Sequence, residues 1–163
     1  MRRHLVPHRI ILSLLLFIIF PVQSAEKTRP LNSLEKMLAG FSTCDLPGVY
    51  IDWQTQRAEH PYLRLLMSRG MKIEDSFAHF NRINLTFHGL RVIKLTVPAN
   101  TFTAHRLVLD APYLKAKSLL EPALNINLPQ TSPLPKNSDE YVPILLPHPE
   151  NPKWSILECI SGI

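Results

Sequence analysis

Glycine is scarce in this chain, with 5 residues among 163, and cysteine is scarcer, with 2. No G-x-G-x-x-G or G-x-x-x-x-G-K-[ST] run is present, so the phosphate-cradling loops of nucleotide-binding enzymes are missing. The G-x-S-x-G elbow of α/β hydrolases is missing too. Charged residues make up 19% of the chain and hydrophobic residues 45%, a composition too apolar for a disordered protein. We therefore expect one folded domain and no nucleotide cofactor.

Residues 1–24 have the composition of a secretory signal peptide. Three arginines and no acidic residue precede an apolar run over residues 10–20. A helix of that length spans roughly 16 Å, about half the hydrocarbon core of a bilayer, which disfavours a permanent span. Val22 and Ser24 suit the −3 and −1 positions of a cleavage site, so we expect an exported domain over residues 25–163. Retention of the leader as an uncleaved anchor is the alternative.

The net charge depends on this leader. The full chain is formally +5, but three of its 18 basic residues lie within the first 24 positions. After cleavage, 15 basic residues exceed 13 acidic ones by two, and the two kinds are interspersed. Nucleic-acid binding requires clustered cations. We therefore predict no nucleic-acid partner.

The two cysteines, Cys44 and Cys159, lie near opposite ends of the predicted exported domain. An even number of cysteines in an oxidising compartment favours a disulfide. A metal pair is the first alternative, but the spacing has nothing in common with C-x2-C ligand pairs. A reactive thiol is the second, and it would need an unpaired sulfur with its own activating base. We predict a structural bridge that joins the start of the domain to its last strand.

Hydrophobic spacing predicts an α+β fold: a mostly antiparallel sheet of about five to six strands, with two or three short helices on one side. Helices are expected over 34–38, 61–69 and 111–121, the second of which could also be an irregular strand. Strands are expected over 49–53, 77–87, 91–97, 102–109, 124–128, 141–146 and 154–160. Glu35 follows Asn32 by three positions, as in a capping box. Residues 54–60 and the proline-rich stretch 129–140 are expected to be loops.

The strand over 77–87 alternates between two faces and ends in a hairpin turn at His88-Gly89. Strict alternation places one set of side chains together on the buried side: Phe77, His79, Asn81, Ile83, Leu85 and Phe87. It directs His79 and His88 to opposite faces, so that only His105 could meet one of them across strands. Asn84-Leu85-Thr86 matches an N-glycosylation acceptor, which matters only in a eukaryotic cell.

These residues form no site of recognised chemistry. Zinc enzymes use three protein ligands, often with an H-E-x-x-H pair, and the histidines of this chain lack such spacing. A glycosidase-type pair would have to come from the carboxylates near residues 45–75, where Glu74 and Asp75 are better read as a solvated hairpin end. We predict no metal site and no cofactor.

One group of side chains is typical of protein-binding surfaces. Tyr50, Trp53 and Tyr62 surround the loop at 54–60. The predicted partner-binding residues are Tyr50, Trp53, Arg57, His60 and Tyr62, because aromatic and arginine side chains dominate binding hot spots. The alternative is that the aromatic rings are ordinary core or rim residues.

These features favour an exported, non-enzymatic domain that binds another protein of the cell envelope, in the periplasm or outside the cell. An inhibitor or immunity protein against an envelope-targeting toxin or hydrolase would fit the leader, the size and the single bridge. A small envelope hydrolase that uses a carboxylate or histidine from residues 45–60 is the enzymatic alternative. An accessory factor that docks on an envelope assembly through the 129–140 loop is the third.

Overall fold

A six-stranded antiparallel sheet is the main element of the computed structural model, which describes residues 33–99, 103–129 and 142–161. Its strand order is β3-β4-β5-β6-β8-β7. The strands are β3 (Lys72–Glu74), β4 (Phe77–Phe87), β5 (Leu90–Pro98), β6 (Thr103–Leu109), β7 (Ile144–Pro147) and β8 (Ser155–Ser161). A second, two-stranded sheet pairs β1 (Ile51–Asp52) with β2 (Arg57–Ala58). The helices are α1 (Ser33–Met37), the 3-10 helix η1 (Ala39–Thr43), α2 (Pro61–Met67) and α3 (Tyr113–Leu124).

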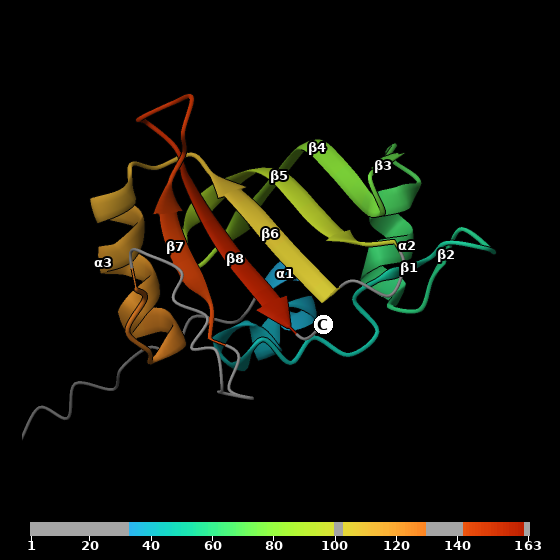
Figure 1. Ribbon diagram of the computed structural model, residues 1–163, viewed down its shortest axis with the longest axis horizontal. Helices are drawn as coiled ribbons and strands as arrows, with labels where there is room; N and C mark the ends of the chain where they lie inside the picture. Colours follow the sequence, from blue (N-terminus) through green and yellow to red (C-terminus); the bar gives the residue numbers. More distant parts are fainter. Residues whose placement is uncertain (1–32, 100–102, 130–141, 162–163) are drawn as a thin grey trace, which may run out of the picture.

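The helices cover one face of the large sheet. Figure 1 shows α3 beside β7, while α2 and the β1–β2 hairpin lie toward the opposite, β3, edge. Leu34 of α1, Leu63 of α2 and Leu120 of α3 all belong to one buried core with Phe80 and Leu107 of the sheet. This arrangement confirms the predicted α+β fold, because a sheet with one apolar face must bury that face against another layer.

A disulfide joins the helical layer to the sheet. Cys44 follows η1 and Cys159 lies on β8, with their Cα atoms 5.3 Å apart and a sequence separation of 115. Both residues are buried in the core. The cysteine pairing expected from the sequence is therefore present.

Two β-bulges interrupt the centre of the sheet. Asn81 pairs with Lys94 and Leu85 with Val92, so four steps along β4 match two along β5. On β5, the two steps from Val92 to Lys94 match a single step along β6. A bulge of this kind breaks the alternation of side chains between faces.

The bulges overturn the alternation predicted for 77–87. Ala78 and Phe80 are fully buried on the helical side, so Phe77 and His79 lie on the other face of the sheet. Beyond the bulge, Phe87 is fully buried again. A single alternating pattern along β4 was therefore wrong.

The strand predicted over 124–128 is also wrong. The helix α3 continues through Pro122 to Leu124 and ends at Asn125, which has a left-handed φ of 54°. Beyond it, the N–H of Ile126 donates to the Glu121 carbonyl and the N–H of Leu128 to the Glu121 carboxylate. Because one glutamate accepts from both backbone groups, this segment needs no strand partner for them.

Other expectations have mixed outcomes. Residues 61–67 form a helix, which resolves the alternative left open there, while β2 lies within a stretch expected to be a loop.

The leader 1–24, the capping residue Asn32 and all but the first residue of the 129–140 loop lie outside the described residues. Across the described parts of the chain, none of the helices has the length and apolar character needed to cross a bilayer.

Candidate functional site

The β1–β2 hairpin carries two of the most exposed aromatic rings of the described residues. Trp53 is 59% exposed and Tyr50 is 40% exposed. The turn between the strands is held by Asp52, whose carboxylate accepts hydrogen bonds from the Thr55 N–H (2.6 Å) and hydroxyl (2.7 Å). These bonds lower the pKa of Asp52, because they favour its charged form. The turn that carries Trp53 is thus fixed by local hydrogen bonds rather than by burial of its ring.

A hollow of about 330 Å³ lies beside Trp53. It is lined by Trp53, Ile73, Glu74, Asp75 and Ser76. Asp75 and Ser76 form the turn between β3 and β4 and have left-handed φ angles of 48° and 71°. Glu74 pairs with Lys72 at 2.9 Å, and this hydrogen bond lowers the pKa of the Glu74 carboxyl. Two tight turns, one from each sheet, therefore flank one depression.

Tyr50 is held in place from the opposite side of the hairpin. Its phenol donates a hydrogen bond of 3.2 Å to the Glu59 carboxylate. The bond and the negative charge of Glu59 raise the pKa of Tyr50, because the phenolate would repel the carboxylate. The ring is thereby oriented while remaining exposed to solvent.

The other predicted partner-binding residues divide into two groups. Arg57 is exposed on β2, directly opposite Asp52. His60 is the N-cap of α2, with its Nδ1 accepting a hydrogen bond of 3.1 Å from the Tyr62 N–H. Tyr62 is partly buried against the core. His60 and Tyr62 therefore have evident roles in the fold, and a role for them in binding stays a prediction.

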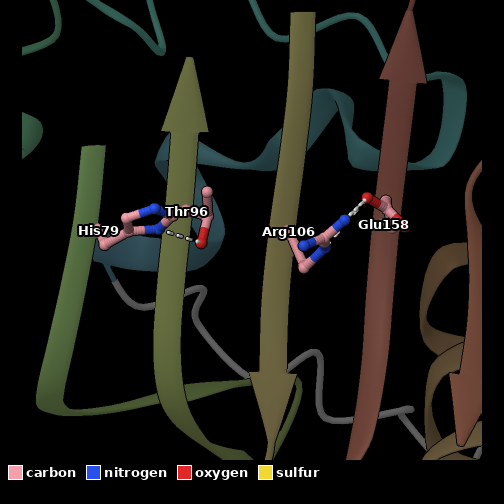
Figure 2. A network of polar contacts seen from close by, with 4 residues as sticks. All are labelled: His79, Thr96, Arg106 and Glu158. Atoms are coloured by element: carbon pink, nitrogen blue, oxygen red, sulfur yellow. Dashed lines mark hydrogen bonds and ion pairs between the residues drawn. The ribbon is translucent and has the colours of Figure 1, made fainter. Parts of the chain in front are cut away.

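A second polar cluster crosses the sheet face opposite the helices, here called the outer face. Cross-strand register places His79, Thr96, Arg106 and Glu158 in one row over β4, β5, β6 and β8. Figure 2 shows the four side chains in this row, joined in two pairs. His79 Nδ1 lies 3.1 Å from the Thr96 hydroxyl, and Arg106 Nε donates to Glu158 at 3.0 Å. The Arg106 Nη2 also contacts the same Glu158 oxygen.

The row borders a small hollow of about 50 Å³ between Phe77 and Ala104. Thr96 and Glu158 are only 4% and 6% exposed, although they lie on the outer face. Burial and the nearby positive charge of Lys94 lower the pKa of His79, so its neutral form is favoured. The sequence did not predict this row. Because the alternation along β4 is interrupted, His79 lies on the face opposite to the one predicted, and the other three residues lie on three further strands.

His105 lies on the opposite face and has a different role. It is 4% exposed, is paired in register with Cys159, and its Nε2 lies 2.7 Å from the Val49 carbonyl. Since a carbonyl can only accept, Nε2 carries the proton. Burial lowers the pKa of His105. His79 and His105 therefore do not meet, which excludes one of the two histidine pairings left open by the sequence.

The hydrolase alternative named a carboxylate or histidine from residues 45–60. The hollow beside Trp53 and the hollow beside His79 each lack Asp52 and His60 among their lining residues. Within the described ranges, no three His, Cys, Asp or Glu residues are grouped so that they could hold a metal ion.

Comparisons with protein-family models, curated proteins and solved structures found no match to this chain. Its function is therefore inferred from its own residues.

Proposed function

We propose that this chain is an exported, non-enzymatic domain that binds another protein of the cell envelope. The contact surface is the aromatic edge, which we define as Tyr50, Trp53 and Arg57 together with the hollow beside Trp53. His60 and Tyr62, at the start of α2, are further candidate contact residues. The observation that carries the proposal is the 59% exposure of Trp53 next to a hollow of about 330 Å³.

An exposed tryptophan leaves a large apolar area in water, and a binding partner could remove that area from solvent. Tryptophan, tyrosine and arginine are the side chains that most often dominate binding energy at interfaces. The Asp52–Thr55 and Tyr50–Glu59 hydrogen bonds restrict the edge before any partner arrives. Less conformational entropy is then lost on binding.

The hollow gives this edge a concave part. Its opposite wall, over residues 73–76, contributes one apolar side chain and two carboxylates. An apolar side chain of the partner could pack there against Trp53, and a basic group could lie near Asp75. The partner surface that fits best is thus a loop with an apolar residue close to a lysine or arginine.

Export is supported by the sequence of residues 1–24 and by the Cys44–Cys159 bridge. Disulfides persist in oxidising compartments such as the periplasm and are rare in the cytosol. An inhibitor or immunity protein against an envelope-targeting toxin or hydrolase is the form of binding protein that we favour. The accessory-factor alternative uses the 129–140 loop in place of the aromatic edge.

The proposal is tested by affinity capture from an envelope extract with the oxidised mature protein as bait. Trp53→Ala is the matched loss-of-binding bait, and Leu114→Ala removes an apolar side chain that is 76% exposed on α3. We expect a stoichiometric protein partner with the wild-type and Leu114→Ala baits but not with Trp53→Ala. The proposal fails if no stoichiometric protein is captured, or if Trp53→Ala captures it equally well.

A further inference from the structure

The double bulge in β4 and β5 creates a basic hollow on the surface of the sheet. It has a volume of about 400 Å³. Its lining residues are Arg82, Asn84, Arg91, Val92 and Ile93. Both arginines and the asparagine are exposed, while Val92 is buried. The hollow therefore has two guanidinium groups and one amide around an apolar floor, and none of its lining residues in the described ranges is acidic.

Among the residues that the structure describes, one carboxylate compensates part of the charge of this lining. Arg91 Nη1 lies 3.5 Å from a carboxylate oxygen of Asp110, and both side chains remain accessible to solvent. A contact of that length through one nitrogen leaves the other Arg91 donors available. Arg82 adds a second guanidinium on the adjacent strand. Two arginines on neighbouring strands suit a doubly charged oxyanion better than a single carboxylate.

The backbone of the bulge is strained at the residues that supply these polar groups. Arg82 and Asn84 have left-handed φ angles of 54° and 45°. Asparagine tolerates this conformation fairly well, but arginine does not, and glycine would adopt it without steric cost. Residues held in strained conformations are concentrated at functional sites. An arginine where glycine would be more stable is an observation independent of the charge of the hollow.

We propose that this hollow binds a phosphate group, presented either by a free phosphate compound or by the headgroup of an anionic lipid. The guanidinium groups of Arg82 and Arg91 donate to the phosphate oxygens, and the Asn84 side-chain amide donates a further hydrogen bond. The site is separate from the aromatic edge, so it does not depend on the function proposed above.

The experiment uses the mature, oxidised protein. Isothermal titration calorimetry with inorganic phosphate tests the free ligand. Co-sedimentation with phosphatidylcholine vesicles, with and without phosphatidic acid, tests the lipid source. Arg82→Gly and Arg91→Ala remove one guanidinium each, and Arg69→Ala removes an exposed cation after α2 as a charge control.

We expect saturable binding that Arg82→Gly and Arg91→Ala each weaken at least tenfold and that Arg69→Ala leaves unchanged. Binding of inorganic phosphate with this pattern identifies a free phosphate compound as the source. Binding only to vesicles containing phosphatidic acid, with the same pattern, identifies a lipid headgroup. Absence of binding in both arms, or binding that both site variants retain, overturns the proposal.

Melting temperature separates a binding role for Arg82 from a structural one. Arg82→Gly relieves the left-handed strain, so this variant should melt at or above the wild-type temperature while losing phosphate binding. Gln56→Gly relieves similar strain at φ 51° in the β1–β2 turn and should retain phosphate binding. If Arg82→Gly fails to fold, Arg91→Ala provides the same binding test with the bulge backbone unchanged. A folded Arg82→Gly that melts well below wild type and still binds phosphate would show that Arg82 has a structural role only.

Discussion

The carboxylate of Glu35 on α1 accepts a hydrogen bond of 2.8 Å from the backbone N–H of His88, 53 positions further along the chain. His88 has a left-handed φ of 46° and precedes Gly89 in the turn between β4 and β5. Glu35 is only 4% exposed. The bond therefore fixes the first helix to the end of the longest hairpin, next to the contact between the Phe41 and Phe87 rings.

Removal of the Glu35 carboxylate should weaken this connection. Glu35→Ala is expected to lower the free energy of unfolding by about 1–3 kcal/mol, because a backbone donor loses its charged acceptor. Glu35→Gln keeps an acceptor oxygen and should lose less. Urea unfolding measures both, and Glu150→Ala, at an exposed glutamate, should stay within about 0.5 kcal/mol of wild type. Equal effects at positions 35 and 150 would contradict this account.

The Arg106–Glu158 pair should show energetic coupling. Arg106→Ala leaves the buried Glu158 carboxylate without its guanidinium partner and should cost about 1–3 kcal/mol. Glu158→Gln removes the buried charge, so the loss in the double variant should be smaller than the sum of the two single losses. A double-mutant cycle by urea unfolding measures the coupling. Strictly additive losses would mean that the pair contributes nothing as a pair.

The disulfide should contribute strongly to stability. The bridge closes a loop with a sequence separation of 115, and loop-closure entropy assigns such a bridge up to about 4–5 kcal/mol. Reduction, or the Cys44→Ser/Cys159→Ser variant, should therefore lower the melting temperature by at least several degrees. Differential scanning calorimetry with and without reductant measures the shift. An unchanged melting temperature after complete reduction would show that the bridge is dispensable for stability.

Acidification should destabilise the protein partly through His105. Its pKa lies below the ordinary value of 6.5 because the ring is buried. As the pH falls below about 6.5, the unfolded chain therefore takes up a proton that the native ring resists. The free energy of unfolding should decrease as the pH falls from about 6.5 to the native pKa of His105. At pH values above about 6.5 it should not depend on the titration of His105.

His105→Gln keeps a donor for the Val49 carbonyl and removes this titration. The slope of stability against pH just below about pH 6.5 should become shallower in this variant. It should not vanish, because the pKa of His79 is lowered as well. Urea unfolding at several pH values measures the slope, and a variant slope equal to that of wild type would contradict the assignment to His105.

The sequence predicted those features that local chemistry determines. The His88-Gly89 turn, the helix that begins at Pro61 and the Cys44–Cys159 pair all follow from residue types with strong local or compartmental preferences. Tyr50 and Trp53 are exposed, and their predicted role in binding a partner stays a prediction.

The features that the sequence did not predict depend on tertiary pairing. Nothing local at Arg82 indicates a left-handed bulge, since arginine has no preference for that conformation. The outer-face row requires the register of four strands, in which His79 is the direct cross-strand partner of Thr96. The backbone carbonyl of Glu121 accepts from Ile126 and its carboxylate accepts from Leu128, whereas the alternating sequence of this segment indicated a strand.

The binding function that we propose depends most directly on Trp53. Once the captured partner is purified, its dissociation constant should be measured by calorimetry for wild type, Trp53→Ala and Leu114→Ala. A buried hot-spot tryptophan predicts that Trp53→Ala weakens binding by at least about 2 kcal/mol, roughly thirtyfold, while Leu114→Ala has no effect. Equal affinities of wild type and Trp53→Ala would contradict the account, because the ring would then remain exposed in the complex.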